Sequence, residues 1–145
     1  MRIEAFLAHS PMFALSRAGQ RTEALATRLF AADALGLLEG LVLAAIFLEA
    51  PRTVKPSTLA ATLKTSRSNI SHCLSSLEAR ALIQRKIDPE DARAYCILLR
   101  PAGKRTALRV IAIFDTLQRR YETEIGKGPL RAALDLLGRL DALSD

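Results

Sequence analysis

Residues 66–103 constrain the fold most, because an amphipathic helix there runs into two short strands without a gap. Ser66, or Thr65 before it, has a side-chain oxygen that can accept hydrogen bonds from the free amides of a first helical turn. We therefore expect a helix to begin near Arg67. Apolar residues at the three- and four-residue spacing of one helix face predict its buried side: Ile70, Cys73, Leu74 and Leu77.

The opposite side of this helix carries short or hydrogen-bond-donating side chains, namely Arg67, Ser68, Asn69, Ser71, His72 and Ser75. No acidic residue follows until Glu78. Short donors suit a close approach to base edges and phosphates, which would repel a carboxylate. The face therefore predicts contact with DNA, and a Ser-rich surface helix is the alternative.

A short helix is expected just upstream, where Pro56 and Ser57 precede the apolar residues Leu59, Ala60 and Leu63. Only Lys64 and Thr65 separate it from the next helix. Two helices joined by so short a turn cross steeply, as in a helix-turn-helix. Such spacing also occurs in helical hairpins that bind no DNA.

Residues 82–87 and 95–99 have the composition of two short strands, and residues 88–93 lie between them. Pro89 beside two aspartates is typical of a turn, so we expect a hairpin wing. Arg93 near its tip could enter a minor groove, where negative potential attracts a guanidinium, and Asp91 could hold it extended. A plain surface Asp and Arg pair is the alternative.

Residues 35–103 resemble the MarR family of bacterial transcription regulators, and five positions match the signature of that family: Asp91, Arg93, Leu99, Pro101 and Gly103. The sequence departs from the family pattern at Ala81, where Gly is usual, at Ala92, where a second Arg is common, and at Arg100, where Thr is usual. The resemblance implies a dimer that represses transcription and is released by small, often aromatic and anionic molecules. No pocket residue for such an effector can be assigned from the sequence.

Charge is concentrated in the centre of the chain. Residues 51–121 contain 14 Lys and Arg against 5 Asp and Glu, a net charge of +9, while the whole chain has +6. This distribution favours a polyanionic partner, double-stranded DNA. Four further cations are predicted to contact phosphates: Lys55, Lys64, Arg85 and Lys86. A membrane surface fits less well, because no long helix combines a Lys-rich face with aromatic anchors, and Trp is absent.

Long helices are expected at both ends of the chain. One should span about residues 14–34, with Leu15, Ala18, Thr22, Leu25 and Leu29 along one side. A second should follow Pro101 until Gly126 and Gly128 end it, and Pro129 should open a third. Because a small winged domain cannot cover such helices, we expect them to interlock in a twofold homodimer. A monomeric helical cap is the alternative.

The predicted fold is mostly α with a small β wing, a winged helix-turn-helix with long N- and C-terminal dimerisation helices. Its expected parts are an N-terminal arm and helix (1–34), the winged domain (35–100) and C-terminal helices (101–145). The apolar run at residues 41–48 is too short to cross a bilayer and predicts a buried helix. No signal peptide is evident, so we expect a cytoplasmic protein with Cys73 and Cys96 reduced.

These features predict a sequence-specific transcription regulator that binds a pseudopalindromic operator as a dimer, and the family resemblance implies that it is a ligand-responsive repressor. An architectural nucleoid protein of the same fold and a protein-interaction module are the alternatives. Catalysis is not favoured, since no nucleophile, carboxylate pair or phosphate-binding loop has a usable spacing. No cofactor is expected, and no metal site either, because His9 and His72 are isolated from other ligands.

Overall fold

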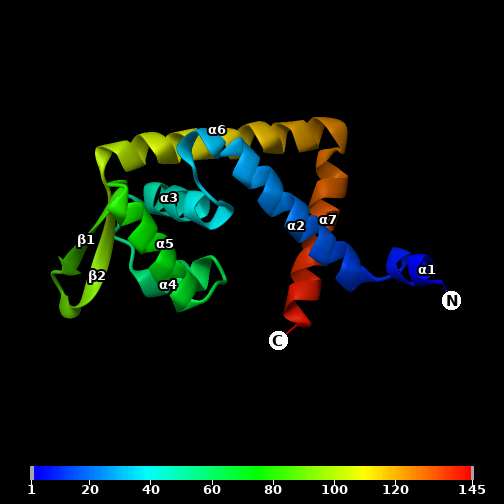
Figure 1. Cartoon of the computed structure of the whole chain (residues 1–145), viewed down its shortest axis with the longest axis horizontal. Coiled ribbons are helices and arrows are strands. Elements are labelled where there is room, and N and C mark those ends of the chain that lie inside the picture. Colours follow the sequence, from blue (N-terminus) through cyan, green and yellow to red (C-terminus); the bar gives the residue numbers. More distant parts are fainter. Residues whose placement is uncertain (1, 145) are drawn as a thin grey trace. The chain divides into compact units, whose positions relative to one another are not determined.

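The computed structural model describes residues 2–144, which form helices and one two-stranded sheet that projects as a hairpin (Figure 1). In chain order the elements are α1 (Ile3–Ala8), α2 (Pro11–Leu29), the 3-10 helix η1 (Ala31–Asp33), α3 (Leu37–Glu49), α4 (Pro56–Thr62), α5 (Arg67–Ala79), β1 (Ile83–Asp88), β2 (Asp91–Leu99), α6 (Pro101–Glu124) and α7 (Lys127–Ala142). The chain divides into two compact units, Met1–Val110 and Ile111–Asp145. The prediction of a mostly helical winged helix-turn-helix is confirmed.

The core of the first unit lies where α3, α4 and α5 pack against one another and against the strands. Its largest fully buried side chains include Leu43, Leu59, Ile70, Leu74, Leu77, Ile83 and Ile97. The predicted apolar face of α5 is therefore correct at every position, because Cys73 is buried as well. The helix predicted from the apolar run at 41–48 is also present as α3, although Leu48 near its end is 69% exposed.

The wing is an antiparallel hairpin in which β1 pairs with β2 from Ile83 opposite Leu99 to Asp88 opposite Asp91. Strand β2 begins four residues earlier than predicted, so only Pro89 and Glu90 remain in the turn. The Asp88 side chain supports this turn, since its Oδ1 accepts the Glu90 N–H at 3.0 Å. A bridge between Val54 and Ile97 ties the segment before α4 to the wing.

The turn from α5 into β1 involves two positions singled out in the sequence, Ala81, which departs from the family pattern, and Gly103, which matches it. Ala81 has φ 56°, the left-handed conformation that Gly adopts more easily, and the turn nevertheless forms with Ala. Gly103 lies against the backbone of Leu82, and a Cβ added to it would stand 1.9 Å from the Leu82 carbonyl oxygen. The same oxygen accepts the Arg100 N–H at 2.9 Å, so α6 starts in direct backbone contact with the root of the wing.

The N-terminal prediction needs two corrections. Residues 14–34 do not form one helix, because α2 starts at Pro11, ends at Leu29 and gives way to η1 and to Ala34 at φ 50°. Ser10 caps α2 by accepting the Phe13 N–H at 3.3 Å, and Pro11 is suited to a first helical turn. A separate helix, α1, precedes it and was not predicted.

The second unit contains the end of α6 and all of α7. Gly126, with φ 99°, separates the two helices as expected. Gly128 does not end a helix, which corrects the prediction, because α7 already begins at Lys127, two residues before Pro129. Within residues 2–144, no helix is long and apolar enough to cross a membrane.

Candidate nucleic-acid interface

The N-terminal end of α5 is fixed by its own side chains. The Ser66 Oγ accepts the Asn69 N–H at 3.0 Å, and the Thr65 Oγ1 accepts from the Asn69 side-chain amide at 3.1 Å. The cap predicted at Ser66 is therefore present, and Thr65 supports it. The six polar residues predicted to contact DNA are all exposed on α5: Arg67, Ser68, Asn69, Ser71, His72 and Ser75.

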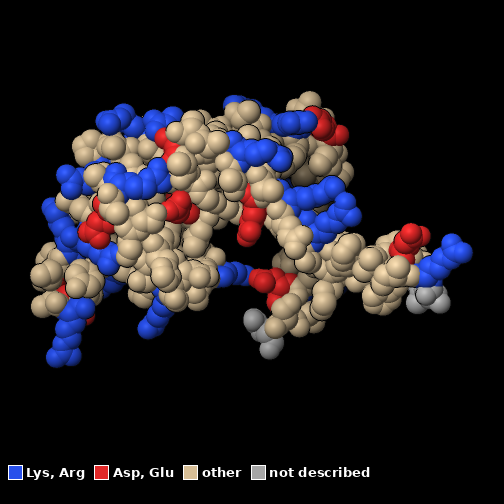
Figure 2. Space-filling view, in the orientation of Figure 1, with Lys and Arg blue, Asp and Glu red and all other residues tan. Residues whose placement is uncertain are grey.

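Three of the predicted cations, from different parts of the chain, surround one hollow of about 300 Å³. Lys55 precedes α4, Arg67 opens α5, and Arg93 lies on β2. Figure 2 shows Lys and Arg side chains extending beyond the wing and beyond the end of the molecule formed by α4 and α5. The arrangement offers an anion such as a phosphate group more than one guanidinium or ammonium partner.

Lys55 already has a partner within the protein. Its Nζ lies 2.8 Å from Oδ2 of Asp88, whose side chain is only 7% exposed. The hydrogen bond from Lys55 and the N–H of Glu90 hold the pKa of Asp88 below its usual range, and Asp88 in turn raises the pKa of Lys55. The pair therefore connects the start of α4 to the wing tip, and Lys55 also lines the hollow.

Arg85 is similarly engaged with α5. Its Nε lies 3.1 Å from Oε2 of Glu78, and its Nη2 donates to the Ser75 hydroxyl at 3.1 Å. Lys64 and Lys86 are exposed, and Lys64 has φ 49° in the turn between α4 and α5. Phosphate contact by these cations remains a prediction.

Asp91 acts on the backbone of the wing. Its Oδ1 accepts the Arg93 N–H at 3.0 Å, a local turn contact that fixes the main chain two residues on. Both side chains are exposed. Asp91 thus holds the main chain at Arg93, and its predicted role in orienting the Arg93 side chain stays a prediction.

Four further residues line the same hollow and were not predicted as site residues, and two of them, Ser57 and Tyr95, carry hydroxyl groups. Tyr95 is 52% exposed, and its ring and hydroxyl are available to a ligand. The sequence held a signal for it, because residues two apart in a strand share a face and Tyr95 is two residues beyond Arg93. Ser57 gave no comparable signal.

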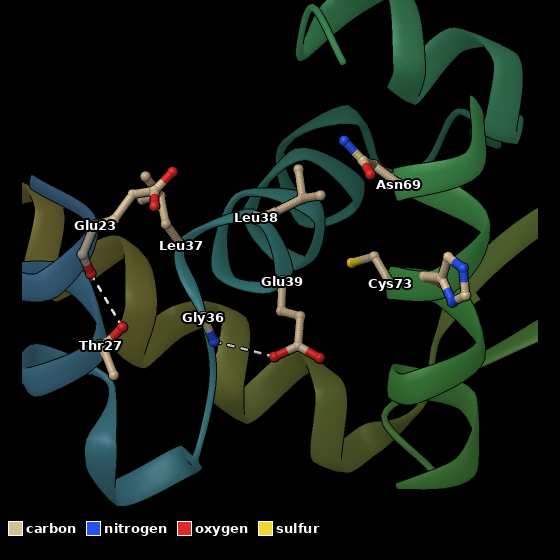
Figure 3. A pocket seen from close by; sticks show the side chains of 9 residues that line it. Glu23, Thr27, Gly36, Leu37, Leu38, Glu39, Asn69 and Cys73 are labelled. Carbon is tan, nitrogen blue, oxygen red and sulfur yellow. Dashed lines mark hydrogen bonds between the residues drawn. The ribbon is translucent and has the colours of Figure 1, made fainter. Parts of the chain in front are cut away.

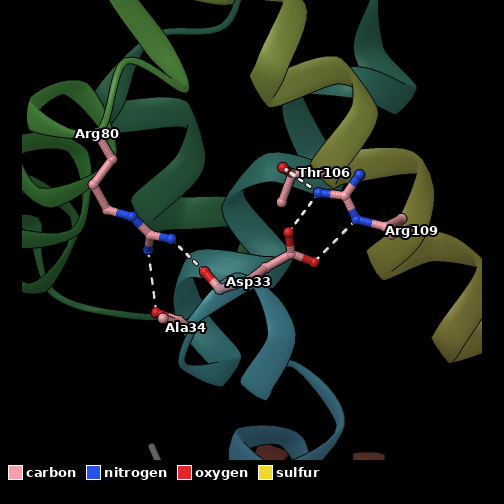
Figure 4. Close-up of polar contacts among 5 residues, drawn as sticks. All are labelled: Asp33, Ala34, Arg80, Thr106 and Arg109. Carbon is pink, nitrogen blue, oxygen red and sulfur yellow. Dashed lines mark hydrogen bonds and ion pairs between the residues drawn. The ribbon is translucent and has the colours of Figure 1, made fainter.

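A polar cluster anchors the far end of α5 (Figure 4). Arg80, which follows α5, donates to the carbonyl oxygens of Asp33 and Ala34, the latter at 3.1 Å. The Asp33 carboxylate is held by Arg109 of α6, with Nε 3.1 Å from Oδ2, and Arg109 also donates to the hydroxyl of Thr106 at 3.0 Å. The Arg109 hydrogen bond lowers the pKa of Asp33. The segment after α2 is thus tied to both α5 and α6.

The cysteines and His9 have structural positions. Cys73 and Cys96 are buried and unbonded to each other, and burial is the main cause that raises the pKa of the Cys73 thiol to about 12. His9 lies with Nδ1 2.8 Å from the Ala5 carbonyl oxygen in the same terminal segment. No group of three potential ligands that could hold a metal occurs among the described residues.

Comparison with known proteins finds likenesses in structure. No family model matches the chain, and no curated protein does either. The structure of the Staphylococcus aureus MepR-DNA complex superposes with a TM-score of 0.86 at 16% identity, covering 94% of this chain and 99% of that one. The transcriptional repressor CouR, bound to a 23-mer DNA duplex, gives 0.76 at 27% identity, covering 96% and 95%.

The transcriptional regulator PcaV from Streptomyces coelicolor, in complex with its natural ligand, gives a TM-score of 0.82 at 20% identity, with 96% of each chain covered. A MarR family transcription regulator, SP03579, gives 0.80 at 19% identity, covering 97% of this chain and 91% of that one. The likeness extends through the wing and both terminal helical segments, beyond the residues that carry the sequence resemblance. These likenesses show that the chain has a winged helix-turn-helix fold, the fold that it shares with these transcription regulators.

Proposed function

We propose that the chain is a transcription regulator, a ligand-responsive repressor that binds a pseudopalindromic operator as a homodimer. The observation that carries the proposal is the hollow shared by Lys55, Arg67 and Arg93 beside the exposed polar face of α5. Lys55 and Arg67 at this hollow match a DNA backbone phosphate placed between a recognition helix and a wing, and Arg93 beside them lies on the strand that would meet the adjacent minor groove.

In this proposal α5 enters the major groove. The exposed polar residues of α5 contact base edges or phosphates there, namely Arg67, Ser68, Asn69, Ser71, His72 and Ser75. The wing follows the backbone outward, and Arg93 enters the adjacent minor groove, where Asp91 fixes its main chain. Lys55, Lys64, Arg85 and Lys86 contact phosphates and contribute affinity without reading sequence.

Dimerisation is supported by apolar side chains left exposed in each unit. The first unit exposes Ile3, Phe6, Met12, Phe13, Leu15 and Leu29, and the second exposes Tyr121, Ile125, Leu134, Leu136, Leu137 and Leu143. A second copy that covered them would bury surface that water solvates poorly. Twofold symmetry then places two α5 helices in successive major grooves, with half-sites about 34 to 36 Å apart or a multiple of that.

The similar structures support the same function. MepR and CouR were each solved with DNA, CouR is described as a repressor, and PcaV was solved with its natural ligand. By analogy, we propose that a small molecule releases this chain from its operator.

The test is binding of the purified protein to DNA from upstream of its own coding sequence, against scrambled duplex of equal length, over a salt series. We expect tight binding to the first duplex and weak, steeply salt-dependent binding to the second. Equal binding to both duplexes would favour the architectural alternative or an operator elsewhere. Absence of binding to either duplex at low salt would refute DNA binding itself.

Arg93→Ala tests the assignment of the wing. If Arg93 enters the minor groove, its removal should weaken operator binding by roughly 1 to 3 kcal/mol. Arg119→Ala is the matched control, since Arg119 is exposed on α6 outside the predicted interface and should leave affinity unchanged. Equal affinities for the two variants would refute the role of Arg93.

A further inference from the structure

A second hollow, of about 600 Å³, lies between α2, the start of α3 and α5, within the first unit. Leu37, Leu38 and Cys73 supply apolar surface to it. In Figure 3 the side chains of Asn69 and Cys73 extend from α5 on one side, and Glu23 and Thr27 belong to α2 on the other. Its volume is that of sites that bind small molecules.

The charge of this hollow is opposite to that of the chain. Glu23 and Glu39 line it, and no Lys or Arg does, although the whole chain has a net charge of +6. The other hollows differ, because Lys55, Arg67 and Arg93 line the one beside the wing. A third hollow, at the wing root, is lined by Arg52 and Lys104. Only the hollow beside α2, of these three, presents carboxylates without cations, and it therefore selects a positive ligand.

Glu39 is held in position by two donors. Its Oε2 accepts the Gly36 N–H at 3.0 Å, and its Oε1 accepts the Ser76 hydroxyl at 2.7 Å (Figure 3 shows the first). Besides burial, the Glu39 charge contributes to the raised pKa of Cys73, which lines the same hollow. The negative potential of Glu39 thus reaches the lining.

The hollow also shares residues with the predicted DNA-binding face. Asn69 and His72 line it, and both are exposed on α5. A molecule in contact with these two side chains would occupy groups that DNA needs. A ligand at this site would therefore act on DNA binding directly, without a change in the distance between the two α5 helices.

We propose that this hollow binds a small organic cation with an apolar body, such as an aromatic amine, and that the cation competes with DNA for Asn69 and His72. The ammonium group pairs with the Glu23 carboxylate, the negative charge of Glu39 adds to the potential of the lining, and the apolar body lies against Leu37, Leu38 and Cys73. The ligand class is opposite in charge to the anionic effector that the family resemblance implies. The competition with DNA, though not the cation site, rests on the proposed function.

The site is tested by calorimetric titration of the full chain, without DNA, with two probes of one shape and opposite charge, 2-naphthylmethylammonium and 2-naphthoate. We expect the cation to bind and the anion to bind far more weakly. Glu23→Gln should weaken cation binding by about two- to fivefold, the range of an exposed ion pair. Glu49→Gln changes net charge equally at the other end of α3, outside the hollow, and should have no effect.

Naphthoate binding as tight as that of the cation, no binding of either probe, or equal affinities in the two variants would each overturn the cation site. A second titration is made in the presence of saturating duplex that the protein binds, and we expect it to give a lower apparent affinity for the cation. Unchanged affinity there would overturn the competition. Failure to bind any duplex would refute the proposed function, while the titration without DNA would still decide the cation site.

Discussion

Gly103 is the position where one added methyl group should damage the fold most directly. The Cβ of Gly103→Ala would stand 1.9 Å from the Leu82 carbonyl oxygen and 2.8 Å from its carbonyl carbon. Both atoms are backbone, so no side-chain rotation can relieve the overlap. Either the start of α6 or the chain that leads into β1 has to move by more than an ångström.

The expected loss of stability is the sum of opposing effects. Overpacking of a close contact costs about 1 to 3 kcal/mol. Moving α6 away from Leu82 also breaks the hydrogen bond from the Arg100 N–H to the Leu82 oxygen, worth about 1 kcal/mol. Ala gains about 0.5 to 1 kcal/mol over Gly in a helix, which offsets part of this. We therefore expect a net destabilisation of about 1 to 3 kcal/mol.

The assay is urea unfolding followed by circular dichroism, with both proteins at the same concentration because dimerisation would shift the midpoint. Gly19→Ala is the control, since Gly19 lies inside α2 with nothing within 4 Å of an added Cβ. It should become more stable by about 0.5 to 1 kcal/mol. A Gly103→Ala protein as stable as the wild type, or stabilised like the control, would refute the close packing of α6 on Leu82.

Three further predictions concern a cap, an ion pair and a thiol. Ser66→Ala removes the acceptor of the Asn69 N–H and should lower the unfolding free energy by about 1 kcal/mol in urea titrations. Because Lys55 lowers the pKa of Asp88, the pair stabilises the fold at neutral pH and is lost as pH falls through that lowered pKa. The stability difference between wild type and Asp88→Asn should therefore shrink in acid, and a difference independent of pH would contradict the pairing. Cys73, buried and with a pKa of about 12, should react with iodoacetamide far more slowly in the folded protein than in urea. Equal rates would place the thiol at the surface.

Local signals accounted for most of the fold. The buried face of α5 follows from helical spacing and its start from a Ser side chain, and both depend only on neighbours in sequence. The extra helix α1 and the start of α2 were missed although Ser10 before Pro11 is a helix-start signal. The break after Leu29 was missed because Ala34 adopts a left-handed conformation that its residue type does not favour.

The exposure of the candidate site residues on α5 was predictable from the sequence, but the contacts that other candidate residues make within the protein were not. Exposure of the polar face of α5 followed from its helical period. The partners of Lys55 and Arg80 did not, because Asp88 and Asp33 are distant in sequence and meet them only in the folded chain. Likewise, nothing in the spacing of Glu23 and Glu39 showed that they line one hollow with α5.

These partners change what the central charge of +9 means for DNA binding. Each phosphate neutralised by a cation that was previously free releases counterions, and this release sets the salt dependence of affinity. Lys55 begins with Asp88 as its partner, and Arg85 has to leave Glu78 and Ser75 before it can reach a phosphate. The binding free energy that each contributes is thus the difference between its ion pair with a phosphate and its ion pair within the protein. This difference is smaller than the contribution of a cation that starts in solvent. The affinity for DNA should therefore fall less steeply with salt concentration than it would if every Lys and Arg in the interface were free before binding. Arg67 and Arg93 should contribute more to this salt dependence than Lys55 and Arg85.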